Sequence, residues 1–70
     1  MKQNYTAVIK QADEWWIGWI AEVPGVNCQE ATREELVESL RDALIETLEF
    51  NRRDAREAAG EGYDEQTITL

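Results

Sequence analysis

Hydrophobic residues in the first part of the chain recur with a period of two, which predicts β-strands. A first strand is predicted over residues 4–11 and a second over 15–23, joined by a short polar turn at 12–14. The second strand contains three tryptophans: Trp15, Trp16 and Trp19. Because so small a chain cannot bury all three alone, either the fold or a partner must cover them.

The second strand ends at Pro24 and Gly25, because proline supplies no ladder donor and glycine permits an unusual turn. A short third strand is predicted over 26–29. The period then changes to that of an amphipathic helix over 32–59. Its apolar stripe is formed by Leu36, Leu40, Leu44 and Leu48, and is widened by Val37, Ala43 and Phe50.

Thr32 and Glu35 match a capping box, in which the hydroxyl accepts a backbone N–H and the glutamate reaches back. A Gly-Glu-Gly sequence at 60–62 ends the helix, and alternation over Gln66–Leu70 predicts a fourth strand. The predicted fold class is therefore α+β, with the order β-β-β-α-β in a single domain of residues 1–70. One long helix packs on one face of a small, mostly antiparallel sheet.

One helix covers only one face of such a sheet. The face predicted to meet the helix carries Tyr5, Ala7, Ile9, Ile17 and Trp19, and the uncovered face carries Val8, Trp16 and Ile20. A contiguous exposed apolar patch marks an interaction surface, and tryptophan is a favoured interface anchor. We therefore predict that Val8, Trp16 and Ile20 form a partner or self-association surface. A slip of one residue in the strand register would exchange the two faces.

The small size of the chain favours self-association. A domain of 70 residues relies on a disulfide, a metal or a partner chain for stability. Cys28 is the only cysteine and histidine is absent, which disfavours both an intrachain disulfide and a zinc site. We expect a homodimer or higher homo-oligomer without metal or cofactor. An exchange of the tail beyond Phe50 between chains stays open.

The charge restricts the partners. Fifteen acidic and seven basic residues give a net charge of −8, so direct binding of nucleic acid is not expected. A negative field attracts basic proteins instead. The sequence contains neither the apolar core of a signal peptide nor a run of about 20 apolar residues, so we expect a cytoplasmic protein that does not enter membranes.

Catalysis is not expected. Two-metal nucleases hold their ions with carboxylates gathered at strand ends, and the acidic residues near predicted strand ends are Asp13, Glu14, Glu22 and Glu30. In a chain with fifteen acidic residues, some fall there by chance. Cys28 has no histidine to activate it as a nucleophile. A non-enzymatic protein without catalytic residues is predicted, with a metal-dependent nuclease as the least favoured alternative.

A tryptophan-rich strand ends in Ala-Glu-Val-Pro-Gly, and a short strand then leads to Gln-Glu-Ala-Thr-Arg-Glu-Glu-Leu at the start of the helix. Over about the first fifty residues, this order resembles the HicB-like antitoxin family. Residues like those of the family stand at Tyr5, Ile9, Glu22, Pro24, Gly25, Gln29, Thr32, Glu34 and Glu35. The chain departs from the family pattern at Ala21, Val26, Glu30, Ala31 and Leu36.

The resemblance implies a partial RNase H-like fold and an antitoxin that neutralises a HicA-type, mRNA-cleaving toxin by direct binding. Many members of the family also carry a C-terminal DNA-binding module, which is not expected here because the sequence ends at Leu70. The alternative is an orphan homo-oligomeric HicB-like domain with a regulatory or structural role and no toxin partner.

Overall fold

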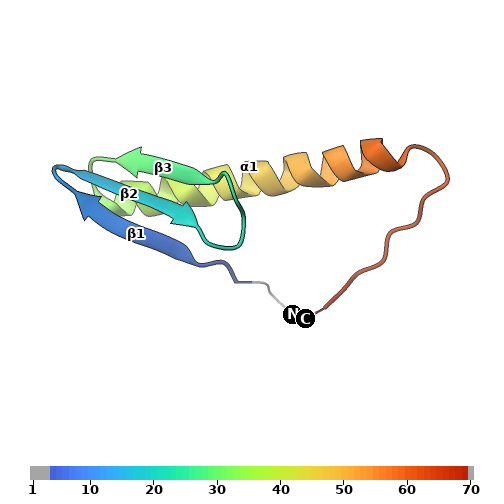
Figure 1. Ribbon diagram of the computed structural model, residues 1–70, viewed down its shortest axis with the longest axis horizontal. Coiled ribbons are helices and arrows are strands. Elements are labelled where there is room, and N and C mark those ends of the chain that lie inside the picture. Colours follow the sequence, from blue (N-terminus) through green and yellow to red (C-terminus); the bar gives the residue numbers. More distant parts are fainter. Residues whose placement is uncertain (1–3, 70) are drawn as a thin grey trace.

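The computed structural model describes residues 4–69, which form a three-stranded antiparallel sheet and one long helix (Figure 1). The strands β1 (Ala7–Ala12), β2 (Trp15–Ile20) and β3 (Asn27–Glu30) lie in the sheet in their sequence order. The helix α1 (Arg33–Ala59) follows β3 and packs on β2 and β3. The predicted α+β class is confirmed, as is the order of these four elements.

A two-residue turn, Asp13 and Glu14, joins β1 to β2 and sets their register. Asp13 has a φ of 57°, in the left-handed region, which aspartate tolerates better than most residues. Ala12 therefore lies opposite Trp15, and each odd-numbered position of one strand lies opposite an even-numbered position of the other. Residues that lie opposite one another point to the same face of the sheet.

The hydrophobic core lies between α1 and the sheet. It consists of four buried residues, Ile20, Val26, Leu36 and Leu40. Partly buried residues that pack against it are Tyr5, Ile9, Trp16, Val23, Cys28, Ala43 and Leu44. The core includes residues of β2, of α1 and of the loop that joins β2 to β3, so one small cluster ties these elements together.

Gly18 allows the helix to approach β2 closely. A Cβ atom at this position would lie 3.2 Å from the methyl groups of both Leu36 and Leu40, and 2.9 Å from the carbonyl oxygen of Val8. These distances are shorter than ordinary contacts between carbon atoms, which are about 3.5–4.0 Å. The centre of the helix-facing surface therefore has no room for a side chain at residue 18.

Both ends of α1 are capped. The Thr32 hydroxyl oxygen accepts a hydrogen bond from the Glu35 N–H at 3.2 Å, and the hydroxyl donates to the Glu35 carboxylate at 2.9 Å. The predicted bond from the Glu35 N–H to the Thr32 hydroxyl is confirmed, whereas the Glu35 carboxylate accepts from the Thr32 hydroxyl and not from the Thr32 backbone N–H of a complete capping box. Gly60, with a φ of 72°, ends the helix, and its N–H donates to the carbonyls of Arg56 and Glu57.

The helix is much longer than the sheet. Its 27 residues span about 40 Å at about 1.5 Å per residue, whereas a six-residue strand spans about 20 Å. The second half of α1 therefore extends beyond the strands (Figure 1). From residue 49 to residue 59 every residue of α1 is exposed. No helix of the described chain is long and apolar enough to cross a membrane.

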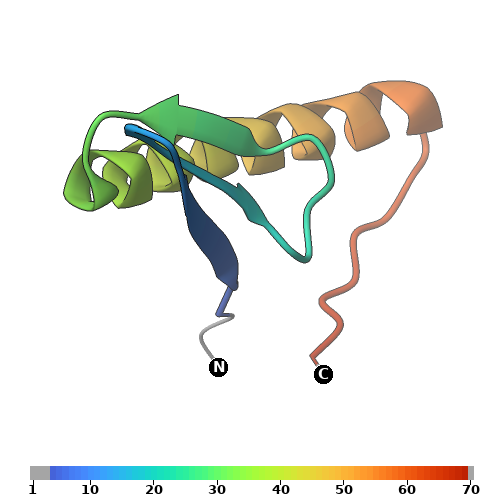
Figure 2. The same cartoon turned by 60° about the vertical axis from the view of Figure 1, so that its left-hand side comes forward.

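The prediction of a fourth strand over Gln66–Leu70 is wrong. Residues 66–69 form no strand, and Leu70 lies outside the described residues. The helix ends at Ala59, beyond the strands, and the tail begins there. The Arg56 guanidinium pairs with the Glu65 carboxylate of the tail through two contacts of 3.0 and 3.1 Å. Beyond this ion pair the tail runs as a separate segment (Figure 2), and Ile68 is 80% exposed.

Candidate protein-binding surface

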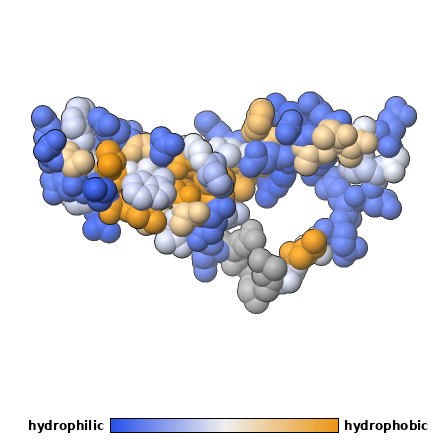
Figure 3. Space-filling model, in the orientation of Figure 1, coloured by the Kyte–Doolittle hydropathy of each residue, from blue (hydrophilic) through white to orange (hydrophobic). Residues whose placement is uncertain are grey.

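The strand register assigns every strand residue to one of the two faces of the sheet. The face turned away from α1, here called the open face, carries Val8, Lys10, Ala12, Trp15, Ile17, Trp19, Asn27 and Gln29. Its exposed large apolar residues are Trp15 at 44%, Trp19 at 41% and Val8 at 38%. The strands lie in front of α1 in Figure 1, and the same view in Figure 3 shows hydrophobic residues gathered over them.

The structure changes the predicted membership of the uncovered face. Val8 lies on the open face as predicted. Ile20 is only 6% exposed and belongs to the core, and Trp16 is partly buried against it, so both predicted positions are wrong. Ile17 and Trp19, which were predicted to meet the helix, lie on the open face instead. The two faces of β2 are therefore exchanged relative to the prediction.

The cause of this exchange is the length of the hairpin turn. A three-residue turn at 12–14 would place odd positions of β1 opposite odd positions of β2. The turn consists of Asp13 and Glu14 only, so odd positions meet even positions. An aspartate able to adopt a positive φ inside a short polar segment favours a two-residue turn. Read together with Ile9 on the helix-facing side, this signal in the sequence would have placed Trp15, Ile17 and Trp19 on the open face.

The charge on the open face differs from that of the chain as a whole. Lys10 is the only charged residue among the strand positions of this face, in a chain of net charge −8. Carboxylates lie at the ends of the hairpin instead: Asp13 and Glu14 in the turn, and Glu22 just after β2. An apolar centre with polar residues around it is the usual anatomy of a protein–protein interface.

Glu22 is fixed at the end of the hairpin opposite the turn. Its carboxylate accepts a hydrogen bond from the backbone N–H of Thr6 at 2.7 Å. This hydrogen bond lowers the pKa of Glu22 below its ordinary value, because it stabilises the charged form. The end of the hairpin therefore keeps a negative charge at neutral pH, and the bond also ties the chain before β1 to the loop after β2.

The acidic residues considered for catalysis do not form a metal site. Within residues 4–69, no group of three or more Asp, Glu, Cys or His side chains is arranged to hold a metal ion. Glu30 accepts a hydrogen bond from the Ser39 hydroxyl at 2.6 Å and so links β3 to α1. Partial burial, and then the nearby charge of Glu30, raise the pKa of the Cys28 thiol. A raised pKa keeps this thiol protonated and poorly nucleophilic.

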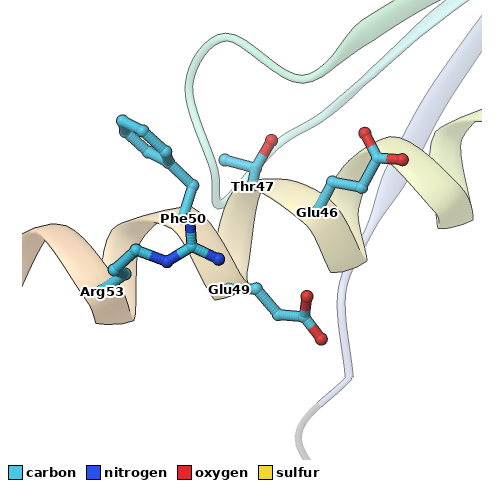
Figure 4. A pocket seen from close by; sticks show the side chains of 5 residues that line it. All are labelled: Glu46, Thr47, Glu49, Phe50 and Arg53. Atoms are coloured by element: carbon cyan, nitrogen blue, oxygen red, sulfur yellow. The ribbon is translucent and has the colours of Figure 1, made fainter.

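Three hollows lie along the second half of α1, one of them also bordered by the start of the tail, and none resembles a small-molecule site. One is lined by Glu46, Thr47, Glu49, Phe50 and Arg53. Figure 4 shows that these side chains come from a single helix and point in different directions. A small-molecule site is normally concave and largely apolar, with a few converging polar groups. The open face is therefore the stronger candidate for a functional surface.

No protein-family model, no curated protein and no solved structure matches the chain.

Proposed function

We propose that this chain is a non-catalytic protein-binding module whose partner docks on the open face. The observation that carries the proposal is the joint exposure of Val8, Trp15 and Trp19 on a face that no described element covers. Tryptophan is enriched among the residues that dominate binding energy in interfaces. Two half-exposed tryptophans on one small face are therefore better explained by a partner than by packing within the chain.

The exposed apolar area of the open face is large enough to make a modest contribution to the free energy of binding. With exposures of 44% and 41%, each tryptophan offers roughly 100 Å² for burial. Together with Val8, burial at about 25 cal/mol per Å² contributes on the order of 6 kcal/mol. Association costs of about 4–15 kcal/mol offset much of this contribution. A stable complex therefore also needs contacts outside the apolar centre.

The carboxylates at the ends of the hairpin supply such contacts for a basic partner. Asp13, Glu14 and Glu22 lie beside the apolar centre, and the net charge of −8 attracts a basic protein over a longer range. Charge complementarity of this kind raises the association rate and fixes orientation more than it raises affinity. The favoured partner has an apolar patch with basic residues around it.

In its specific form, the proposal makes this chain an antitoxin that neutralises a HicA-type, mRNA-cleaving toxin. The support comes from the HicB-like order of residues, from the acidic charge, and from the open face as a docking surface. A toxin that cleaves RNA needs a basic surface to hold its substrate. An acidic protein bound there blocks access to RNA without any catalysis of its own.

A direct test measures RNA cleavage by a purified HicA-type toxin while the concentration of this chain is raised. We expect cleavage to stop near a fixed molar ratio of the two proteins. The matched variants are Trp19→Glu on the open face and Ile45→Glu on α1, since both replace an exposed apolar residue by a carboxylate. Trp19→Glu is expected to lose inhibition and Ile45→Glu to keep it. Full inhibition by Trp19→Glu would remove the open face from the proposal.

The second candidate function is an orphan homo-oligomeric domain with a regulatory or structural role. The observation that favours it is the absence of carboxylates among the strand positions of the open face. Two chains of net charge −8 approach one another with least repulsion where carboxylates are missing. A folded homo-oligomer that Trp19→Glu dissociates, together with no inhibition of any HicA-type toxin, would favour this candidate over the first.

A further inference from the structure

The outer edge of β1 has no strand beside it in the described part of the chain, because β1 is the first strand of the order β1-β2-β3. The Thr6 carbonyl accepts a hydrogen bond from the Ala21 N–H at 2.9 Å, which fixes the direction of the backbone groups at the start of the hairpin. In an antiparallel ladder, successive residues point their backbone groups alternately to the two sides. The N–H and C=O groups of Ala7, Ile9 and Gln11 therefore point outward from the sheet.

The tail after α1 has the residue pattern of a strand but lies beside none. Thr67, Ile68 and Thr69 are β-branched, and such residues favour strands. Ile68 is 80% exposed, so no described residue of its own chain covers it. The ion pair between Arg56 and Glu65 holds the start of the tail beside the end of α1, beyond the sheet.

We propose that residues 66–69 of a second copy add as a fourth strand along the outer edge of β1, so that two copies exchange their tails. This surface is separate from the open face and does not depend on the proposed function. Each copy donates one tail and accepts one, so the exchange closes as a dimer with two-fold symmetry and leaves no tail unpaired. Strand addition to an exposed edge is a recurrent mode of recognition.

The charges of the two segments are complementary. Residues 60–69 carry Glu61, Asp64 and Glu65 and no basic residue, whereas β1 carries Lys10 and no carboxylate. Among the described strands, only β1 carries a net positive charge and so attracts an acidic segment. Within each copy, Arg56 already pairs with Glu65, so Asp64 is the carboxylate next to the proposed strand that is available to Lys10 of the other copy.

A second copy is favoured over the tail of the same chain. The ion pair with Arg56 anchors Glu65 at the far end of a 27-residue helix. In their own chain, residues 66–69 form no strand with β1. A second copy has no such tether to β1, so its tail can align along the full edge.

The test combines sedimentation equilibrium with amide hydrogen exchange of the full chain over a range of protein concentrations. The Ile9 and Gln11 amides point outward, so they are expected to exchange fast in dilute samples. They should become at least about 10-fold slower as the dimer forms, because strand pairing protects amides from exchange. Amides of β2 that already bond to β1 or β3 should keep the same protection throughout.

Two proline substitutions remove the pairing from either side. Ile68→Pro deletes a donor from the tail, and Gln11→Pro deletes an outward donor of β1 while leaving the β1–β2 ladder intact. Each is expected to raise the dimer dissociation constant at least about 10-fold without unfolding the monomer, since both side chains are exposed. Glu61→Pro, between Gly60 and Gly62, is the matched control and is expected to leave the dimer unchanged.

Three outcomes would overturn the proposal. The first is a chain that stays monomeric up to millimolar concentration. The second is a dimer that resists both Ile68→Pro and Gln11→Pro. The third is a dimer dissociated only by Trp19→Glu, which would place self-association on the open face. Because Trp19 does not belong to the β1 edge, failure of the tail exchange and failure of the open-face proposal give different results.

Discussion

The two faces of β2 differ in what occupies their centres. The face toward α1 has Gly18 at its centre, where Leu36 and Leu40 come so close that a Cβ atom has no room. The open face has Trp15 and Trp19, each more than 40% exposed. Two of the three tryptophans of this strand therefore lie where no helix limits their size, whereas Trp16 lies at the margin of the core. The exposure of Trp15 and Trp19 indicates that they serve something other than the core of their own chain.

The comparison shows that hydrophobicity alone does not identify a core. The buried residues of the helix-facing side are aliphatic and of medium size: Ile20, Val26, Leu36 and Leu40. The most bulky apolar residues stay at the margin or outside it. Substitutions on the helix-facing side should therefore change stability, whereas substitutions on the open face should change binding.

The largest effect on stability is expected for Leu40→Ala. Leu40 is 1% exposed, and its truncation should lower the free energy of unfolding by about 3 kcal/mol through lost burial and a remaining cavity. Ile45→Ala, on the same helix but 51% exposed, should cost no more than about 0.5 kcal/mol. Urea unfolding of both variants gives the comparison. Equal losses would show that the side of α1 facing the sheet is not the core.

Gly18→Ala is expected to lower the free energy of unfolding by about 2 kcal/mol, because an added methyl group overpacks the contact between β2 and α1. The double variant Gly18→Ala with Leu40→Ala sharpens the test. Truncation of Leu40 makes room for the new Cβ, so the combined loss should be smaller than the total of the two single losses. Strict additivity in urea unfolding would contradict the close approach at Gly18.

Thr32→Ala should cost about 1 kcal/mol, because the Glu35 N–H at the start of α1 loses its hydrogen-bond acceptor. Thr32→Ser keeps the hydroxyl and is expected to retain most of the stability. Thermal unfolding followed by circular dichroism compares the two variants. A loss that is the same for serine and alanine would show that the hydroxyl does not cap the helix.

The smallest effect is expected at the ion pair between Arg56 and Glu65, where a change of pH should release the tail without unfolding the chain. The Arg56 guanidinium lowers the pKa of Glu65 below its ordinary value of 4.5. The interaction is therefore complete above pH 4.5 and is lost as the pH falls through the lowered pKa of the folded chain. The NMR signals of the Arg56 side chain should follow this titration. A transition that coincides with global unfolding, or is unchanged in Glu65→Gln, would contradict the assignment.

Much of the fold follows from local sequence signals. The helix was predicted from Leu36 and Leu40 at helical spacing and from the pairing of Thr32 with Glu35, and both signals act within one or two turns of chain. The first two strands were predicted from period-two alternation. These features depend on neighbours close in sequence, so they can be predicted from the sequence alone.

The assignment of β2 residues to the open face depends on whether the hairpin turn has two residues or three. Alternation correctly grouped Trp15, Ile17 and Trp19, and also Trp16 with Ile20, but it does not say which group meets the helix. That choice depends on how β1 and β2 pair, and a turn of Asp13 and Glu14 reverses the result of a turn one residue longer. Strand alternation therefore predicted the sets of residues, and pairing decided their environment.

The prediction of a strand in the tail is wrong for a different reason. Thr67, Ile68 and Thr69 have the composition of a strand, but a strand needs an edge to pair with. In the described chain the tail leaves the end of α1 beside the ion pair of Arg56 and Glu65, and residues 66–69 pair with no strand. Local composition indicates that a segment has the propensity to form a strand, but it does not indicate which strand edge is available for pairing.

The central claim is that the open face binds a protein. The most direct measurement is titration calorimetry of a HicA-type toxin with the wild-type chain, Trp19→Glu and Ile45→Glu, after circular dichroism has shown that all three are folded. Loss of an interface anchor costs about 2 kcal/mol or more, so Trp19→Glu should weaken binding at least about 30-fold. Ile45→Glu should bind within about twofold of wild type. Wild-type affinity in Trp19→Glu, or an equal loss in Ile45→Glu, would contradict the claim.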